Sequence, residues 1–440
     1  MARRRPCHDD GARRIRIRDA PDVSAIRRRG VSARAPNVEV LTFGCRLNMV
    51  DSEELARQSA SDTVIVNTCA VTNEATRQAR QAIRRLHRER PEARIVVAGC
   101  AARIDPQSFE TMEGVSRVIA EQPENRARAA EEGTRGFLAV QNGCDHSCTF
   151  CIIPLGRGAA RSAPPDEIIR QARALVESGK QEIVLTGVDL TSYDADGLKL
   201  GALVRRLLRE LPELARLRLS SIDCIEADDD LLIAMREEER LCPHLHLSLQ
   251  AGDDLILKRM KRRHARADAI RFCDALRKAR PDIIFGADFI AGFPTETDEM
   301  FAQTLALAEE CGLTHLHVFP FSPRPGTPAA RMPQVAREIA KERAARLREI
   351  GERALVRHLD AQRGKTLRFL TERGGVARAA DFTLARTPGI EAGRMIDARV
   401  TGHDGKALNA ITNFSAANLE HNHERVAGQS HPVEGPAPRA

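Results

Sequence analysis

The segment Cys144-Asp145-His146-Ser147-Cys148-Thr149-Phe150-Cys151 decides how the fold and chemistry of this chain are interpreted. Its cysteines follow a C-x3-C-x2-C spacing, which puts three thiols into one short loop. Three thiolates can hold three irons of a four-iron cluster and leave the fourth iron open, whereas a plain electron carrier needs four cysteines. The spacing therefore indicates an iron-sulfur centre whose open iron can bind a reactant.

Two other uses of these cysteines need to be weighed. A zinc site with His146 as a further ligand is disfavoured, because structural zinc sites usually contain two C-x2-C pairs and this chain has one. A disulfide framework is disfavoured because 11 cysteines is an odd count in a long chain without a secretory signal pattern. The cysteines thus indicate a reducing compartment such as the bacterial cytoplasm. A membrane protein is not expected, since no apolar run approaches the roughly 18 residues that cross a bilayer.

A second set of thiols, Cys45, Cys69 and Cys100, is scattered along the preceding segment. Strands are predicted at 38–43, 63–67 and 93–98, with a helix at 73–89. This alternation predicts a parallel βαβ sheet, and each strand leads directly into one of the cysteines. Because the carboxyl ends of parallel strands share one edge, the three thiols would converge there and could hold a second open cluster. Ordinary buried cysteines are the alternative.

Beyond an expected linker over 121–136, the alternation resumes on a larger scale. Strands are predicted at 137–141, 182–186, 216–220, 244–249, 283–290 and 315–319, and helices at 166–178, 200–210, 228–237, 265–279 and 297–311. Six β/α units predict an α/β fold with a partial TIM-like (β/α)6 barrel. Its active site is expected at the carboxyl ends of the strands.

Small or polar residues stand at or near several of these strand ends: Gly187, Asp189, Ser221, Gln250 and Asp288. A glycine such as Gly187 lets a ligand approach the backbone, and the carboxylate of Asp189 could face a ligand ammonium. Ordinary turn chemistry is the alternative for each residue alone. Their repetition beside the cysteine loop favours a ligand pocket.

The net charge of the chain is concentrated in its N-terminal segment. Residues 1–36 contain 11 Arg and 4 Asp, so they alone account for the net charge of +7. This segment is expected to be a disordered basic tail that attracts RNA, with a transit peptide disfavoured by its aspartates.

Short apolar runs at 366–370 and 395–400, broken by glycines, predict a small β-barrel near the C-terminus. The tail over 413–440 is expected to be disordered.

The predicted C-terminal barrel is basic. Between residues 363 and 410 the sequence has five acidic residues and nine Lys or Arg: Arg363, Lys365, Arg368, Arg373, Arg378, Arg386, Arg394, Arg399 and Lys406. We therefore expect an RNA-binding module in which residues such as Arg368 and Arg378 contact phosphates, with a solvated barrel face as the alternative. Truncation after Arg363 is expected to weaken RNA affinity and leave the chemistry intact.

At these motifs the chain resembles the methylthiotransferase family of radical SAM enzymes. The similar segments are 142–154, 157–162, 185–190, 246–250 and 292–296, together with 44–48, 66–72 and 98–101 in the N-terminal part. The resemblance covers about residues 38–410. Within the family, Gly44-Cys45-Arg46-Leu47-Asn48 and Leu185-Thr186-Gly187-Val188-Asp189-Leu190 most resemble the branch that acts on threonylcarbamoyladenosine next to the tRNA anticodon.

The resemblance implies two 4Fe-4S clusters and S-adenosylmethionine (SAM) as cofactors. SAM would be cleaved at the cluster on Cys144, Cys148 and Cys151, and the resulting radical would activate carbon 2 of the adenine. The auxiliary cluster on the second cysteine set, Cys45, Cys69 and Cys100, would hold the sulfur that another SAM methylates. The resemblance further implies SAM-pocket roles for Phe150, Gly187, Asp189, Ser221, Gln250 and Asp288. Implied partners are tRNA, an electron donor such as flavodoxin or ferredoxin, and an unidentified sulfur donor.

The resemblance also implies a domain order: a basic tail (1–36), an N-terminal methylthiotransferase domain (37–130), a radical SAM domain (131–360), a TRAM-like RNA-binding barrel (361–412) and a second tail (413–440). Methylthiolation of tRNA threonylcarbamoyladenosine at position 37 is the leading hypothesis. The alternatives are methylthiolation of isopentenyladenosine in tRNA or of a ribosomal-protein aspartate. A non-catalytic iron-sulfur RNA-binding protein would retain the cysteines without a SAM pocket.

Overall fold

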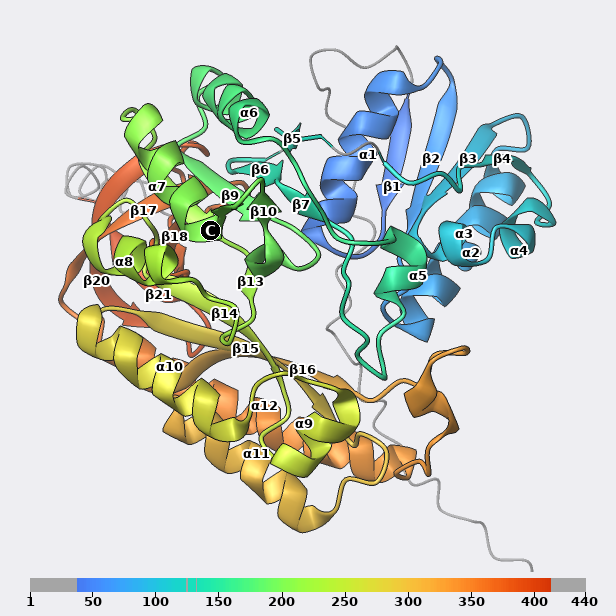
Figure 1. The fold of residues 1–440 in the computed structure, drawn as a ribbon. Coiled ribbons are helices and arrows are strands. Elements are labelled where there is room, and N and C mark those ends of the chain that lie inside the picture. The colour runs from blue at the N-terminus through green and yellow to red at the C-terminus, as the bar shows by residue number, and fades with distance from the viewer. Residues whose placement is uncertain (1–37, 124–125, 132, 413–440) are drawn as a thin grey trace, which may run out of the picture.

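The computed structural model describes residues 38–123, 126–131 and 133–412 of the 440-residue chain (Figure 1). The expected tails over 1–36 and 413–440 lie outside these residues. Within the described residues, no helix is both long enough and apolar enough to cross a membrane.

The N-terminal part is a four-stranded sheet with helices beside it. Its strands are β1 (Glu39–Thr42), β2 (Thr63–Thr68), β3 (Arg94–Gly99) and β4 (Val115–Val118), and its helices are α1 (Arg46–Gln58), α2 (Asn73–Glu89), α3 (Cys100–Ile104) and α4 (Gln107–Glu110). All neighbouring strands are parallel, which confirms the predicted βαβ sheet. Every residue of β2 is buried, as suits a strand covered on both faces. The side chain of Thr72 accepts a hydrogen bond from the Ala75 N–H and caps α2.

The central part contains the six predicted β/α units. Its main strands are β6 (Gly136–Ala139), β9 (Glu182–Thr186), β12 (Arg216–Leu219), β13 (Ser221–Ile222), β14 (His244–Gln250), β15 (Ile284–Ala291) and β16 (Leu313–Pro320). The outer helices are α6 (Pro165–Glu177), α7 (Leu200–Glu210), α8 (Asp229–Glu237), α9 (Asp254–Met260), α10 (Arg266–Ala279) and α11 (Asp298–Glu310). β12 passes through Ser220 into β13 and so joins two sheets into a partial barrel. Pairing among these strands is parallel, as predicted.

Several short elements complete this part of the chain: β5 (Arg128–Ala130), β7 (Gln141–Asn142), α5 (Ile153–Arg157), β8 (Arg161–Ser162), η2 (Leu190–Ser192), β10 (Asp194–Ala195), β11 (Leu198–Lys199) and η3 (Pro328–Arg331). The prediction of a linker over 121–136 is wrong at β5, which pairs antiparallel with β6 at the sheet edge. Arg128 makes this strand resemble a loop in sequence. In the structure the Arg128 guanidinium is buried, and its charge is compensated by an ion pair with Asp51 of α1.

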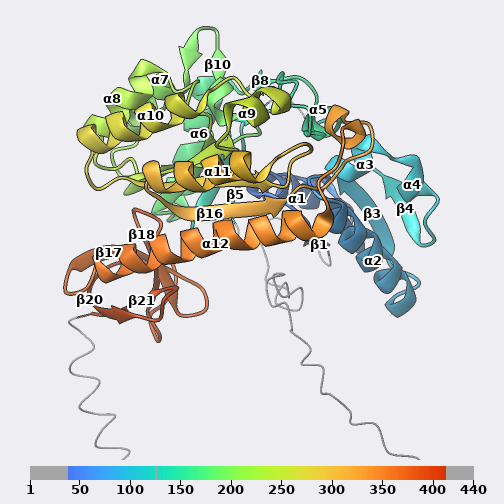
Figure 2. The ribbon, with the colours of Figure 1, turned by 90° about the horizontal axis from the view of Figure 1, so that it is seen from below.

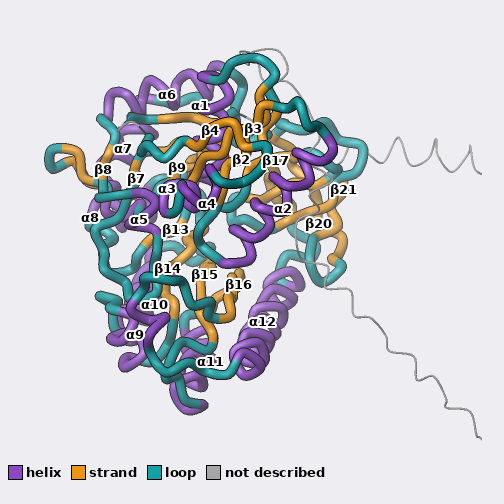
Figure 3. The backbone as a smooth tube through the Cα atoms, turned by 90° about the vertical axis from the view of Figure 1, so that its right-hand side faces the viewer, coloured by secondary structure: helices purple, strands orange, loops and turns teal. Residues whose placement is uncertain are grey.

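Helix α1, which the sequence analysis did not predict, fills one side of the barrel interior. Leu47 and Val50 on α1 pack against Phe137, Ala139 and Val184 on the inner faces of β6 and β9. Helix α2 lies on the opposite side of the N-terminal sheet, toward the viewer in Figure 3. The N-terminal part therefore supplies one wall of the barrel interior.

The chain ends in the predicted β-barrel. Its strands are β17 (Thr366–Glu372), β18 (Val376–Ala379), β19 (Leu384–Arg386), β20 (Met395–His403) and β21 (Leu408–Ile411), which close in the order β17-β18-β19-β21-β20. The 24-residue helix α12 (Arg337–Asp360) runs beside β16 and leads into this barrel (Figure 2). The barrel has its own apolar core, which includes Phe369, Ala398 and Leu408.

Candidate active site

The C-x3-C-x2-C loop is held in place by backbone hydrogen bonds. The N–H of Cys144 donates to the Gly158 carbonyl at 3.1 Å, and the N–H of Thr149 donates to the Met260 carbonyl at 3.1 Å. Gly143 has φ +76°, and a Cβ there would lie 1.8 Å from the Ala159 carbonyl oxygen, so only glycine fits. The loop therefore presents its three thiols from a fixed backbone.

Two sulfurs of this loop accept hydrogen bonds from backbone donors. Cys144 Sγ accepts from the His146 N–H and Cys151 Sγ accepts from the Ile153 N–H, both at 3.4 Å. Burial, together with the charges of Asp189, Cys151 and Cys148, raises the pKa of the Cys144 thiol to about 12. Burial likewise raises the pKa of Cys151 to about 11. The Arg262 guanidinium donates to Cys148 Sγ at 3.7 Å, so each of the three sulfurs has an N–H donor. Such a set of thiols can hold a cluster with one open iron, and cluster binding would release their protons.

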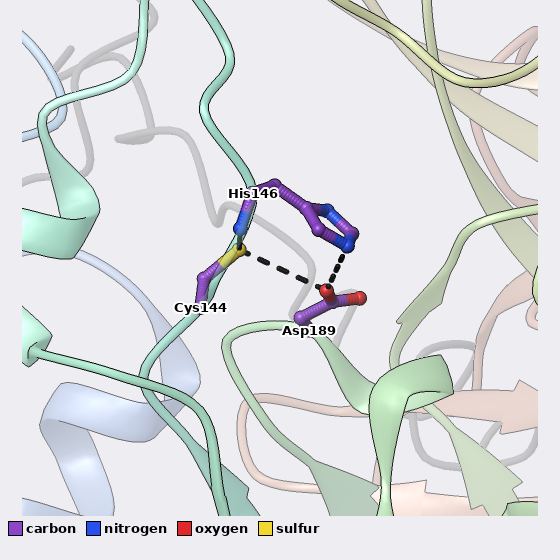
Figure 4. A group of neighbouring side chains, drawn as sticks. All are labelled: Cys144, His146 and Asp189. Carbon is purple, nitrogen blue, oxygen red and sulfur yellow. Dashed lines mark hydrogen bonds and ion pairs between the residues drawn. The ribbon is translucent and has the colours of Figure 1, made fainter.

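Asp189 lies beside this set (Figure 4). Its Oδ2 atom is 3.7 Å from Cys144 Sγ and 3.3 Å from Nε2 of His146, which lies 3.4 Å from a carboxylate oxygen of Glu226. Burial raises the pKa of Asp189, and the charge of Glu226 raises it further. His146 thus has two carboxylate partners, which accounts for its position without a zinc ion.

Gly187 is explained by close packing. A Cβ at this position would lie 2.9 Å from Oε1 of Gln141, and that same oxygen accepts a hydrogen bond from the Asp189 N–H at 2.9 Å. Gly187 and Gln141 therefore fix the turn that aims Asp189 at the cysteine loop.

The other expected SAM-pocket residues are spread over the carboxyl half of the barrel. Phe150 packs beside Phe293 in a separate apolar cluster, Ser221 begins β13, and Gln250 ends β14 with a left-handed φ of +69°. Asp288 lies deeper, within β15. Within the described residues, none of these four side chains forms a hydrogen bond or ion pair with a sulfur of the cysteine loop, in contrast to Asp189.

Asp288 belongs to a histidine cluster that the sequence analysis missed. One of its oxygens lies 3.0 Å from Nε2 of His246 and 3.3 Å from Nδ1 of His317. Burial opposes ionisation of Asp288, but the hydrogen bonds to the two imidazoles hold its pKa below the usual range. The alternation of His246, Asp288 and His317 with buried apolar residues on three adjacent strands was the available signal.

The second cysteine set also comes together. Cys69 and Cys100 are buried at the ends of β2 and β3, and Cys45 is exposed just before α1. Gly44, at φ +101°, has its missing Cβ position 2.8 Å from Cys69 Sγ. Burial, together with the neighbouring Cys45 and Cys100 thiols, raises the pKa of Cys69 to about 11. Like the first set, this set consists of three cysteine thiols.

Arg157, to which the sequence analysis assigned no role, connects the two cysteine sets. It ends α5, the short helix that follows Cys151, and its side chain is only 1% exposed. Its Nε atom is 3.1 Å from Cys100 Sγ, and its Nη1 atom donates to Asp51 at 2.6 Å. Ile152, which precedes α5, also packs into the N-terminal core. The loop that carries one set is therefore anchored on the other.

Comparisons with known proteins agree with this arrangement. Residues 138–308 match the radical SAM superfamily model, and residues 37–120 match the model of the uncharacterized protein family UPF0004. The chain is 45% identical over 377 residues to the threonylcarbamoyladenosine tRNA methylthiotransferase MtaB of Rickettsia prowazekii, covering 78% of this chain and 90% of the relative. It is 35% identical over 423 residues to the tRNA-2-methylthio-N(6)-dimethylallyladenosine synthase of Cereibacter sphaeroides, covering 84% and 97%.

Among solved structures, the radical S-adenosylmethionine methyltransferase TsrM of Kitasatospora setae, with cobalamin and a 4Fe-4S cluster bound, is similar with a TM-score of 0.49 and 14% identity. The match covers 64% of this chain and 68% of that one. The family assignment depends instead on the relatives at 45% and 35% identity, which are covered nearly from end to end. Because relatives of this identity are matched over nearly their whole length, the chain belongs to the methylthiotransferase family of radical SAM enzymes.

Proposed function

We propose that this enzyme methylthiolates tRNA and converts N6-threonylcarbamoyladenosine at position 37 to its 2-methylthio derivative. The observation that carries the proposal is the 45% identity to the Rickettsia relative that is named for this substrate. The relative named for dimethylallyladenosine is 35% identical, so that sister activity is the second candidate.

The proposal includes two 4Fe-4S clusters, one on Cys144, Cys148 and Cys151 and the other on Cys45, Cys69 and Cys100. When bound, these clusters and SAM supply the electron, the radical and the sulfur for the reaction. Asp189 is suited to receive the SAM ammonium because its carboxylate lies beside Cys144. Arg157 positions the auxiliary set by donating to Cys100. An external electron donor such as flavodoxin or ferredoxin belongs to the same proposal.

The substrate assignment can be tested with reconstituted enzyme and two matched anticodon stem-loops. One carries threonylcarbamoyladenosine and the other isopentenyladenosine. We expect the 2-methylthio product only from the first, as measured by mass spectrometry of the nucleosides. Product from the isopentenyl substrate alone would overturn the substrate assignment in favour of the sister activity.

Cys69→Ala is expected to stop methylthiolation and leave uncoupled SAM cleavage in place. Cys69 lies buried at the end of β2, whereas the loop carrying Cys144 is held by backbone hydrogen bonds within the central part. The measurements are deoxyadenosine formation and the yield of 2-methylthio nucleoside. Cys311→Ala, at a buried cysteine outside both sets, serves as the control and should retain both. Methylthiolated product from the Cys69 variant would remove the auxiliary role.

The expected RNA-contacting arginines of the C-terminal barrel differ in their surroundings. Arg368 is exposed on β17, so we retain it as a phosphate contact. Arg378 is a poor candidate, because its guanidinium lies 3.2 Å from Glu372 and 4.5 Å from the ring centre of Phe382. The positive charge of Arg378 is therefore already compensated by Glu372.

A further basic surface lies on helix α2, where Arg84, Arg85 and Arg88 are exposed. In the described part of the chain these three side chains form no ion pair or hydrogen bond. Arg84 also lines a cavity of about 540 Å³ that reaches Ala70 and Ala101, the neighbours of Cys69 and Cys100. We include this surface, the α2 arginines, in the proposed tRNA interface.

Replacing both Arg84 and Arg88 with glutamine is expected to weaken tRNA binding and to lower the slope of log affinity against log salt by about two units. Each lost phosphate contact removes close to one released counterion. Arg209→Gln on α7 is the matched control, because Arg209 is also exposed and forms no contact in the described residues. Filter binding across a salt series measures both slopes. Equal slopes in the double variant and the wild type would remove α2 from the interface.

A further inference from the structure

The inner face of the barrel is polar where a closed barrel would be filled with apolar residues. His246 and His317 face each other with ring centres 4.4 Å apart, and both contact Asp288. One layer below, the rings of His244 and His315 lie 5.8 Å apart. Closed β/α barrels fill this space with branched apolar side chains. The polar lining, with His317 and Phe319 exposed on β16, therefore suits a polar ligand.

Phe382 from the C-terminal barrel lies at the bottom of this interior, stacked on His244 with ring centres 5.0 Å apart. Four arginines surround its ring, and three of them have a carboxylate within 4 Å: Arg218 with Glu182 at 2.7 Å, Arg378 with Glu372 at 3.2 Å and Arg135 with Glu372 at 3.3 Å. The positive charge of these three side chains is thus compensated within the protein.

Arg46 is the exception in this layer. It begins α1, directly after Cys45, and its guanidinium carbon lies 6.0 Å from the ring centre of Phe137 and 5.9 Å from that of Phe382. Among the described residues, no carboxylate lies within 4 Å of its guanidinium and no hydrogen bond is made to it. The Arg46 side chain is partly buried, so this charge lies inside the barrel without an anionic partner.

An uncompensated guanidinium in such a place costs free energy, which a ligand anion can offset. A carboxylate is the anion that matches the guanidinium fork, because two parallel hydrogen bonds can form. The two candidate substrates differ in this respect: the threonylcarbamoyl group ends in a carboxylate, and the isopentenyl group is a hydrocarbon.

We propose that Arg46 is a specificity-determining residue that binds the threonyl carboxylate of the substrate inside the barrel. This inference rests on the proposed function and deepens it. Arg46 is adjacent in the chain to Cys45, so a substrate held by this side chain would lie beside the auxiliary cysteine set. The Asp288 carboxylate does not compete with the substrate for the Arg46 guanidinium, because it already interacts with the imidazoles of His246 and His317.

The test compares anticodon stem-loops that carry threonylcarbamoyladenosine as the free acid or as its methyl ester. Wild-type protein should bind the acid roughly tenfold to a hundredfold more tightly, as charged hydrogen bonds contribute. Arg46→Gln should bring the ratio of the two dissociation constants close to one. Arg46→Lys should give an intermediate ratio, since it retains the charge without the fork. Arg209→Gln should leave the wild-type ratio unchanged.

Iron content and the electron paramagnetic resonance spectrum of each variant show whether the neighbouring auxiliary set is intact. If Arg46→Gln retains the wild-type ratio, the role of Arg46 is overturned and the substrate assignment stands. If wild-type protein binds acid and ester equally and prefers an isopentenyladenosine stem-loop, both are overturned. If Arg46→Gln does not fold, Arg46→Lys decides the question, because an unchanged wild-type ratio in that variant would also overturn the role of the guanidinium.

Discussion

Replacing Cys144, Cys148 and Cys151 together with alanine is expected to abolish SAM cleavage while roughly four irons per chain remain. The loss follows because the only thiols of this loop are removed, and an open iron is needed to bind SAM. The remaining irons belong to Cys45, Cys69 and Cys100, which are gathered at the edge of a separate sheet. Deoxyadenosine formation and iron analysis after anaerobic reconstitution measure the two effects.

The control for this variant is Cys273→Ala, which removes a fully buried cysteine in the helical layer. It should retain both clusters and SAM cleavage. Deoxyadenosine formation by the triple variant would refute the assignment of the cysteine loop. Loss of all iron would show that the two sets depend on each other, and the contact between Arg157 and Cys100 would be the structural reason.

The elements that sequence patterns predicted well are those with clear apolar periodicity. The predicted helices at 73–89 and 200–210 coincide with α2 and α7, and the predicted strand at 182–186 coincides with β9. Helix α1 was not predicted because it buries Asp51, Ser52 and Glu53 together with its apolar residues. These polar groups obscure the periodicity and are satisfied by partners far away in the chain.

The residues of the candidate site likewise divide into those that sequence patterns could predict and those that they could not. The gathering of the six cysteines into two sets could be predicted because each stands at a strand end or in one short motif. Arg46 and Arg157 could not be assigned a role, because what matters is their position relative to other domains. Arg157 meets Asp51, 106 residues earlier in the chain, and Arg46 lies beside Phe382 of the C-terminal barrel. Residue type alone gave no sign of either contact.

Contacts of the C-terminal barrel lead us to revise one expectation drawn from the sequence. Its basic composition predicted an RNA-binding module whose removal would leave the chemistry intact. In the structure, Arg216 donates to the carbonyl oxygen of Arg378 at 3.0 Å and also to that of Arg368. The ring of Phe382 covers His244 and lies 5.2 Å from the Arg218 guanidinium carbon. The C-terminal β-barrel therefore packs against the central β/α barrel through Arg216, Arg218 and His244.

Truncation after Arg363 is consequently expected to destabilise the whole enzyme and to reduce SAM cleavage along with tRNA affinity. It would expose Glu182, Arg218 and His244, all of which are buried in the full chain. Thermal unfolding and deoxyadenosine formation by the truncated protein measure the effect. An unchanged unfolding temperature with full SAM cleavage would restore the view that the barrel serves only to bind RNA.

A point variant separates this docking from RNA binding. Phe382→Ala should lower stability by about 2 kcal/mol, because a partly buried ring is lost that stacks on His244 and lies near arginines. Phe382 also has a left-handed φ of +75°, which is strained for any residue except glycine. Phe382→Gly should therefore be less destabilised than Phe382→Ala, by about 1 kcal/mol. Ile411→Ala, at a 47% exposed position of the same barrel, is the control and should unfold like the wild type. If Phe382→Ala unfolds at the wild-type temperature, the ring does not hold the barrel to the catalytic domain.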